Sequence, residues 1–257
     1  MSDQLQVQAR QQLFNKVAAV TIFFWIAKVM ATTVGETGAD FLIFKLKFGL
    51  ANTSYLMSAI LVAVLAAQIR SRRYLPWLYW SAVVLVSIVG TLITDSLVDN
   101  FGVRLETTTL VFTLALIAAF GVWYSREKTL SVKSITSVRR ELFYWLAILL
   151  TFALGTAAGD LLAERWQVGY LISGLIFAGL IGLVVLGYYF FRLSEVTAFW
   201  IAYVLSRPLG ASAGDLLTQP VASGGLGLGT NLVSFAFLAI IVGLVAFTSL
   251  GRKLPAL

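Results

Sequence analysis

The chain has 257 residues, of which 59% are hydrophobic and 12% are charged, and its formal net charge is +7. Soluble globular proteins carry about 25% charged residues, so this composition indicates an integral membrane protein. The sequence contains no Cys and no His, which excludes disulfides, thiolate chemistry and histidine-based catalysis or zinc sites. The basic residues lie between apolar runs, where they orient membrane helices, so we expect no nucleic-acid partner.

Eight apolar segments are long enough to cross the hydrocarbon core, which takes about 20 residues of helix. Their short connections favour one compact bundle. We therefore predict an all-α, polytopic fold in which residues 1–257 form a single transmembrane domain. The polar, Gln-rich first sixteen residues are interpreted as a short cytoplasmic lead-in. The eight segments lie at roughly 17–38, 51–69, 76–97, 106–124, 142–162, 169–191, 197–217 and 229–250.

An even number of spans places both termini on the same side of the membrane. Thirteen Lys and Arg residues would lie on that side, and only Lys45, Lys47, Arg104 and Arg165 on the other. Basic residues favour the cytoplasmic side, so both termini are predicted to be cytoplasmic. The thirteen are Arg10, Lys16, Arg70, Arg72, Arg73, Arg126, Lys128, Lys133, Arg139, Arg140, Arg192, Arg252 and Lys253.

One pattern occurs four times along the chain: a Trp, a Gly ten residues later and an Asp five residues after the Gly. Each copy begins a unit of two predicted helices, so all four units have the same orientation. Such parallel repetition predicts a ring with approximate fourfold symmetry, or two similar halves. The units span about 17–70, 76–125, 141–192 and 196–251. Their markers are Trp25, Gly35 and Asp40; Trp80, Gly90 and Asp95; Trp145, Gly155 and Asp160; and Trp200, Gly210 and Asp215.

The sequence resembles a family of bacterial membrane proteins defined by four tandem repeats, each with two transmembrane segments and a characteristic Trp. The resemblance covers about residues 17–250 and rests on Trp25, Trp80, Trp145 and Trp200, with the Gly and Asp at fixed offsets. It implies the eight-helix fold and a multi-pass protein of the bacterial cytoplasmic (inner) membrane. It implies no assigned activity, because the family is known as one of unknown function.

The repeated acids are candidate ion or proton sites. Four acids at equivalent positions of parallel repeats are expected to face a common axis, and rings of carboxylates attract cations. The first copy adds Glu36, where the others have Thr91, Thr156 and Ala211. The predicted binding residues, and tentative metal ligands, are Glu36, Asp40, Asp95, Asp160 and Asp215. In the alternative interpretation the aspartates only cap loops, and Gly35, Gly90, Gly155 and Gly210 form a packing seam.

Two bases lie inside apolar runs, Lys28 in the first copy and Arg207 in the fourth. A base near mid-membrane costs about 2.5–3.5 kcal/mol, so each should face the bundle interior and find a partner on another helix. They are candidates for compensating the acidic charge or for binding substrate. The repeated Trp residues are expected to pack between helices; the alternative is that they shape an apolar pocket.

These features favour a membrane transporter for a cation, such as the divalent metal manganese, with proton coupling left open. No nucleophile–base pair or phosphate loop stands out, so we predict that the protein is not an enzyme, and no cofactor is expected beyond a divalent cation as substrate. One alternative is a carrier or sensor of a small anionic or organic ligand bound by Lys28 and Arg207. Another is a scaffold that uses the basic 125–140 loop. The expected partners are the lipid bilayer and a small ion or solute; homo-oligomerisation is left open.

Overall fold

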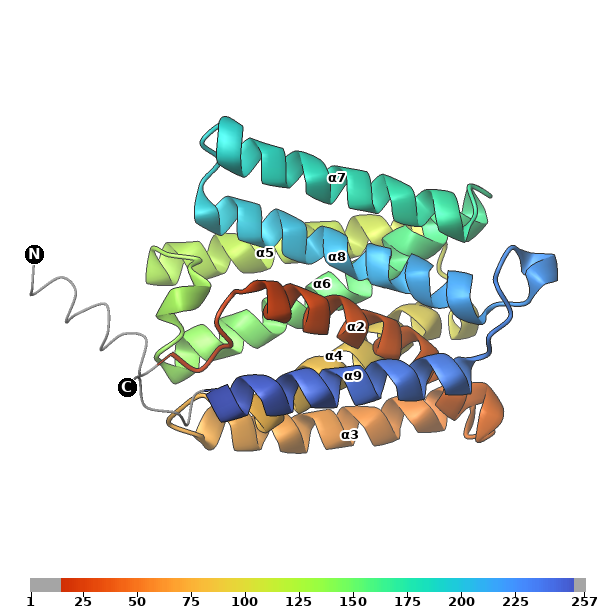
Figure 1. Ribbon diagram of the computed structural model, residues 1–257, viewed down its shortest axis with the longest axis horizontal. Helices are drawn as coiled ribbons and strands as arrows, with labels where there is room; N and C mark the ends of the chain where they lie inside the picture. The colour runs from red at the N-terminus through yellow and green to blue at the C-terminus, as the bar shows by residue number, and fades with distance from the viewer. Residues whose placement is uncertain (1–14, 252–257) are drawn as a thin grey trace, which may run out of the picture.

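The computed structural model describes residues 15–251, and within that range the chain forms eight long α-helices and no strand (Figure 1). The all-α prediction is therefore confirmed. Arg10, Arg252 and Lys253, which were counted toward the basic side, lie outside the described range. The helices are α2 (Ile22–Asp40), α3 (Gly49–Arg70), α4 (Pro76–Asp95), α5 (Leu105–Glu127), α6 (Val138–Asp160), α7 (Tyr170–Phe190), α8 (Glu195–Thr218) and α9 (Thr230–Gly251).

Four helices form a closed inner ring. Helix α2 contacts α4, α4 contacts α6, α6 contacts α8, and α8 returns to α2. The other four lie outside, and each packs against the inner helix of the following repeat: α3 on α4, α5 on α6, α7 on α8 and α9 on α2. Figure 1 shows the last two of these pairs side by side. Of the two arrangements that the repeats predict, the structure adopts the ring.

The repeat glycines mark the closest approach between neighbouring inner helices. A Cβ atom at Gly35 would lie 1.8 Å from Ser87 Oγ, and one at Gly210 would lie 1.7 Å from Thr32 Oγ1. Only a residue without a side chain permits such close helix packing. The contacted residue is always three positions before the glycine of the next repeat, so one interface recurs around the ring. The four contacts are Gly35 with Ser87, Gly90 with Phe152, Gly155 with Arg207, and Gly210 with Thr32.

Six of the described helices are long and apolar enough to cross a membrane: α3, α4, α5, α6, α7 and α9. The outer ones bury only 11–17% of their apolar window inside the protein, against 56% for α4 and 67% for α6. Most of the outer-helix surface is therefore apolar and faces away from the ring, as expected of a multi-pass membrane protein. Helices α2 and α8 are more polar because they carry charged side chains that point into the ring.

The two ends of the bundle differ in charge. At the aspartate end, α2, α4 and α6 continue past their aspartates as the short π-helices η1 (Phe41–Lys45), η2 (Ser96–Asn100) and η4 (Leu161–Arg165), whereas α8 stays α-helical to Thr218. At the opposite end, called here the basic end, lie ten of the thirteen bases assigned to that side; the other three are outside the described residues. Helix α2 begins and α9 ends at this basic end (Figure 1).

The segment before α2 is not helical, and contacts of Lys16 hold it at the basic end. Lys16 is buried, pairs with the carboxylate of Glu141 at the start of α6, and donates to the carbonyl of Ile69 at 2.8 Å. Gln68 donates to the same Glu141 at 3.1 Å. Residues 17–20 are apolar but not helical, so the predicted first helix began too early: α2 starts at Ile22, where Thr21 caps its N-terminus.

Candidate functional site

The Arg207 side chain lies at the centre of the inner ring. It extends from α8 and contacts each of the three other inner helices. Its Nη2 donates to Glu36 Oε2 on α2 and to Thr156 Oγ1 on α6, both at 2.7 Å, and also to Thr91 Oγ1 on α4. Its Nη1 donates to the carbonyl of Thr32 at 3.1 Å. A side chain that reaches all three partners must lie near the ring axis, and Arg207 is fully buried.

This cluster joins the two most divergent repeats. Glu36 is specific to the first copy and Arg207 to the fourth, and the structure brings them together as an ion pair on the axis. Sequence reasoning did not identify Thr91 and Thr156 as their partners. The signal was present, because both threonines follow the repeat glycine and therefore occupy the position of Glu36. Gly155 leaves room for the methylene stem of Arg207, whose Cγ would lie 2.3 Å from a Cβ atom there.

Lys28 lies eight residues before Glu36 on α2, about two turns nearer the basic end, and has no such partner. Its Nζ is buried and forms no hydrogen bond with any described residue. It lies 4.3 Å from the ring centroid of Tyr203 and 4.6 Å from that of Phe152. The Arg207 guanidinium carbon lies 5.6 Å from the same Phe152 ring. Aromatic faces attract cations but do not replace a counter-ion. Of the charged residues described at the centre of the bundle, Lys28 and Arg207 are bases, and Glu36 is the acid that pairs with Arg207.

Replacing Lys28 by Met is expected to raise thermal stability, because it keeps the apolar stem and removes a buried amine that has no hydrogen bond. The gain should be about 1 kcal/mol or more, given that replacing buried charge by well-packed apolar groups often stabilises by 1–4 kcal/mol. Thermal unfolding of the purified protein in detergent measures it. The shorter Lys28→Ala variant would instead leave a cavity and lower stability, and a loss for both variants would contradict this view of Lys28.

The four repeat aspartates gather around Glu36 without forming a ligand cluster. Asp40, Asp95 and Asp160 are half-buried and Asp215 is buried. Each is close enough to Glu36 for their charges to interact. None of the four carboxylates makes an ion pair or a side-chain hydrogen bond with another residue in the range 15–251. They form an acidic vestibule, defined here as these four residues at the aspartate end.

A metal centre does not emerge from this geometry. Among the described residues, no group of three or more acidic side chains lies close enough together to hold a metal ion. The assignment of Glu36 and the four aspartates as metal ligands therefore has no support in this conformation. The arrangement consists of the four aspartates at one end of the ring, the buried Glu36–Arg207 ion pair at its centre, and Lys28, which has no ion pair, on the side of the basic end.

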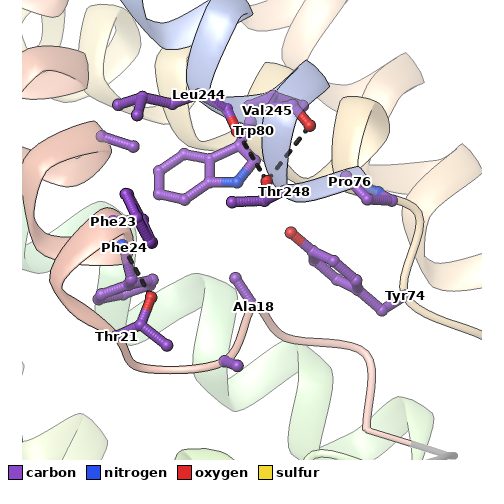
Figure 2. Close-up of a pocket in the computed structure, with 12 residues that line it drawn as sticks. Ala18, Thr21, Phe23, Phe24, Tyr74, Pro76, Trp80, Leu244, Val245 and Thr248 are labelled. Atoms are coloured by element: carbon purple, nitrogen blue, oxygen red, sulfur yellow. Dashed lines mark hydrogen bonds between the residues drawn. The ribbon is translucent and has the colours of Figure 1, made fainter. Parts of the chain in front are cut away.

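The four repeat tryptophans occupy equivalent positions but have different surroundings. Trp145 is buried, and Trp200 donates to the carbonyl of Leu130 at 2.9 Å. Trp80 instead borders a cavity of about 240 Å³ between α2, α4 and α9, and Figure 2 shows its indole facing that space beside Thr248. Trp25 borders a larger cavity of about 600 Å³ between α2, α7 and α8. Trp80, Trp145 and Trp200 are thus buried in the core, although Trp80 also borders a cavity, and neither Lys28 nor Arg207 lines the cavities at Trp25 and Trp80.

Comparison with known proteins identifies the repeat itself. Neither a curated protein nor a solved structure matches the chain. A sequence family described as "Repeat of Unknown Function (DUF347)" matches it in four copies, at residues 23–74, 78–129, 143–194 and 198–253. These copies cover most of the chain and begin near the four tryptophans. The chain therefore belongs to the DUF347 repeat family, as a four-repeat helical membrane protein.

Proposed function

We propose that this protein is a membrane carrier, not an enzyme, and that it moves a small cation along the axis of its inner ring. The observation that carries the proposal is the Glu36–Arg207 ion pair at the centre of the ring, with the acidic vestibule at one end. Ionisable residues inside membrane bundles are costly, and they mark ion pathways and proton relays. A bundle that needed only stability would not place three charged residues, Lys28, Glu36 and Arg207, in its core.

The complete topology forms part of the proposal. Helices α2 and α8 lie between membrane-crossing neighbours in the ring, so we infer that they cross as well and that the chain spans the bilayer eight times. Their polar side chains are then compatible with lipid because these face the ring interior. The excess of bases at the basic end favours its placement in the cytoplasm, with the acidic vestibule facing outward across the bacterial inner membrane.

The mechanism we infer is an exchange of partners at Glu36. The four carboxylates of the vestibule raise the local concentration of cations. A cation that moves beyond them meets Glu36, which must release Arg207 to bind it. Thr91 and Thr156 are already acceptors for the guanidinium and would hold it after that release. The ion pair therefore closes the axis until a cation competes for the carboxylate.

Transport measurements on reconstituted vesicles test this mechanism. Uptake of Mn²⁺, Na⁺ and K⁺ into proteoliposomes, with a pH-sensitive dye inside, reports both the ion moved and any proton exchanged. Glu36→Gln is expected to lower transport about tenfold or more, as when about 1.4 kcal/mol of ion binding is lost. The double variant Asp95→Asn/Asp160→Asn should also lower it, through the lost attraction of the vestibule.

The control is Asp99→Asn, which removes one negative charge from an exposed residue at the same end of the bundle. It should transport like the parent protein. Undiminished transport in both the Glu36 and the double aspartate variants would refute the mechanism, and vesicles that move no tested cation would refute the cation as substrate.

A second candidate function is supported by the excess of positive charge at the core. Lys28 Nζ and Arg207 Nε are both buried and lack hydrogen-bond partners among the described residues. They could receive the charged group of a small anionic solute. Thermal stabilisation by small carboxylates or phosphate, with none by metal or alkali cations, would favour an anion carrier over a cation carrier.

A further inference from the structure

The cavity beside Trp25 is an open groove that is larger than the cavity of about 240 Å³ at Trp80, whereas side chains cover the equivalent Trp200. We call it the α7 groove; it lies between α2 and α7, over α8. The equivalent Trp200 is covered by Phe120 and Trp123 of α5, with ring centroids 4.8 and 5.7 Å away, and by the Leu130 carbonyl. At the α8–α2 contact the corresponding residues of α7 are Val185 and Tyr188, and a volume of about 600 Å³ remains beside them and Trp25.

The α7 groove has the shape and polarity of a site for an acyl chain. Its lining runs along α8 from Glu195 to Leu209, which is about 21 Å of helix. That length exceeds one leaflet of the hydrocarbon core, about 15 Å. The side chains along it are apolar, among them Trp25, Val184 and Phe199. Apart from Ser206, the polar residues of the lining lie at the end nearest the basic side.

That polar end lies where the headgroup of a lipid would be. Ser131, Lys133 and Glu195 line it, and Lys133 forms an exposed ion pair with Glu195. Tyr188 and Tyr189 border the same end, and tyrosines typically lie at the level of the headgroups. An ammonium group at the mouth of an apolar groove complements a phosphate at the head of an acyl chain.

The groove is continuous with the surface that faces lipid. On α7, Val185 and Tyr189 line the groove and are 47% and 74% exposed, and the neighbouring Leu183 is 63% exposed. The outer helices present the same apolar surface around the bundle. We propose that the α7 groove is a binding site for one phospholipid, with an acyl chain against Trp25 and the headgroup at Lys133. The proposal is independent of whether the protein transports a cation.

The test compares two variants of α7 that add the same ring on different faces. Val184→Phe fills the groove, whereas Leu183→Phe adds bulk to the adjacent lipid-facing surface outside it. Native mass spectrometry of protein purified in mild detergent measures the phospholipid retained per chain. We expect about one per chain for the parent protein and for Leu183→Phe, and about tenfold weaker retention for Val184→Phe, as for the loss of roughly two buried methylene groups.

Delipidated protein then distinguishes the possible occupants. Added phospholipid should raise the thermal midpoint of the parent and of Leu183→Phe, and should leave that of Val184→Phe unchanged. A rise with free fatty acid and none with phospholipid would overturn the proposal, because the headgroup would have no role. A change in oligomeric state with Val184→Phe alone would assign the groove to a second copy of the chain. Equal lipid retention by Val184→Phe and Leu183→Phe would show that the α7 groove is not a specific lipid site.

Discussion

Replacing Arg207 by Met is expected to lower the free energy of unfolding by about 3–5 kcal/mol, because Glu36 is then left buried without its counter-ion. The loss comes from the stranded carboxylate more than from the bonds removed, since Thr91 and Thr156 are neutral and can bond elsewhere. Unfolding in mixed detergent micelles, followed by tryptophan fluorescence, measures the difference. Arg165→Met is the control, because Arg165 is exposed and pairs only with Glu106 at the surface.

The double variant Glu36→Gln/Arg207→Met separates stability from function. With neither charge present, most of the lost stability should return, although transport should not. The core would then fold, but residue 36 could no longer release an arginine and bind a cation. If the double variant were as unstable as the sum of the two single variants, Glu36 and Arg207 would not be coupled, and the ion pair would have no energetic role.

Alanine at Gly210 is expected to destabilise the ring where α8 meets α2. Its Cβ atom would lie 1.7 Å from Thr32 Oγ1 and 3.1 Å from the Val29 carbonyl, so the helices must separate. Overpacking of this kind costs about 1–3 kcal/mol and sometimes more. Gly35→Ala should behave in the same way at the α2–α4 contact. Thermal unfolding and the yield of monodisperse protein from membranes report both effects.

The matched control is Gly179→Ala, in the middle of α7, where an added Cβ atom meets nothing within 4 Å. It should be neutral or stabilise by about 0.5–1 kcal/mol, because alanine favours the helix. Comparing the ring variants with Gly179→Ala separates the effect of the close helix contact from the general gain in helix propensity when alanine replaces glycine. Equal behaviour of all three variants would show that the ring glycines do not set the spacing between helices.

The Trp–Gly–Asp period was sufficient to predict the four repeats, because equivalent side chains recur at fixed offsets in each of them. It could not choose between a ring and two halves, since both place Gly35 and Gly90 in identical local surroundings. Apolarity predicted the helices but misplaced the start of α2, where residues 17–20 are apolar and yet not helical. Hydropathy measures the preference of residues 17–20 for burial and does not determine their backbone conformation. The contacts of Lys16 that hold this segment at the basic end cannot be read from hydropathy.

The central site was harder to predict than the fold. The charged residues Lys28, Glu36 and Arg207 could be identified because apolar helices rarely contain charges. Their pairing could not be identified, because Glu36 and Arg207 are 171 positions apart and meet only when α8 closes against α2. The aspartates were expected to converge on an ion. Each is close enough to Glu36 for their charges to interact, but no three acids among the described residues lie close enough together to hold a metal ion.

Ring closure also bears on how the chain is made. Among the described helices, α2 comes first in the chain, and the helices that complete its surroundings, α8 and α9, come last. At a typical 5–20 residues per second, about 10–30 s pass between the emergence of Glu36 and that of Arg207. During that time Glu36 has no counter-ion from α8. Among the described helices, α2 is therefore made first and is the last to gain all its neighbours in the ring.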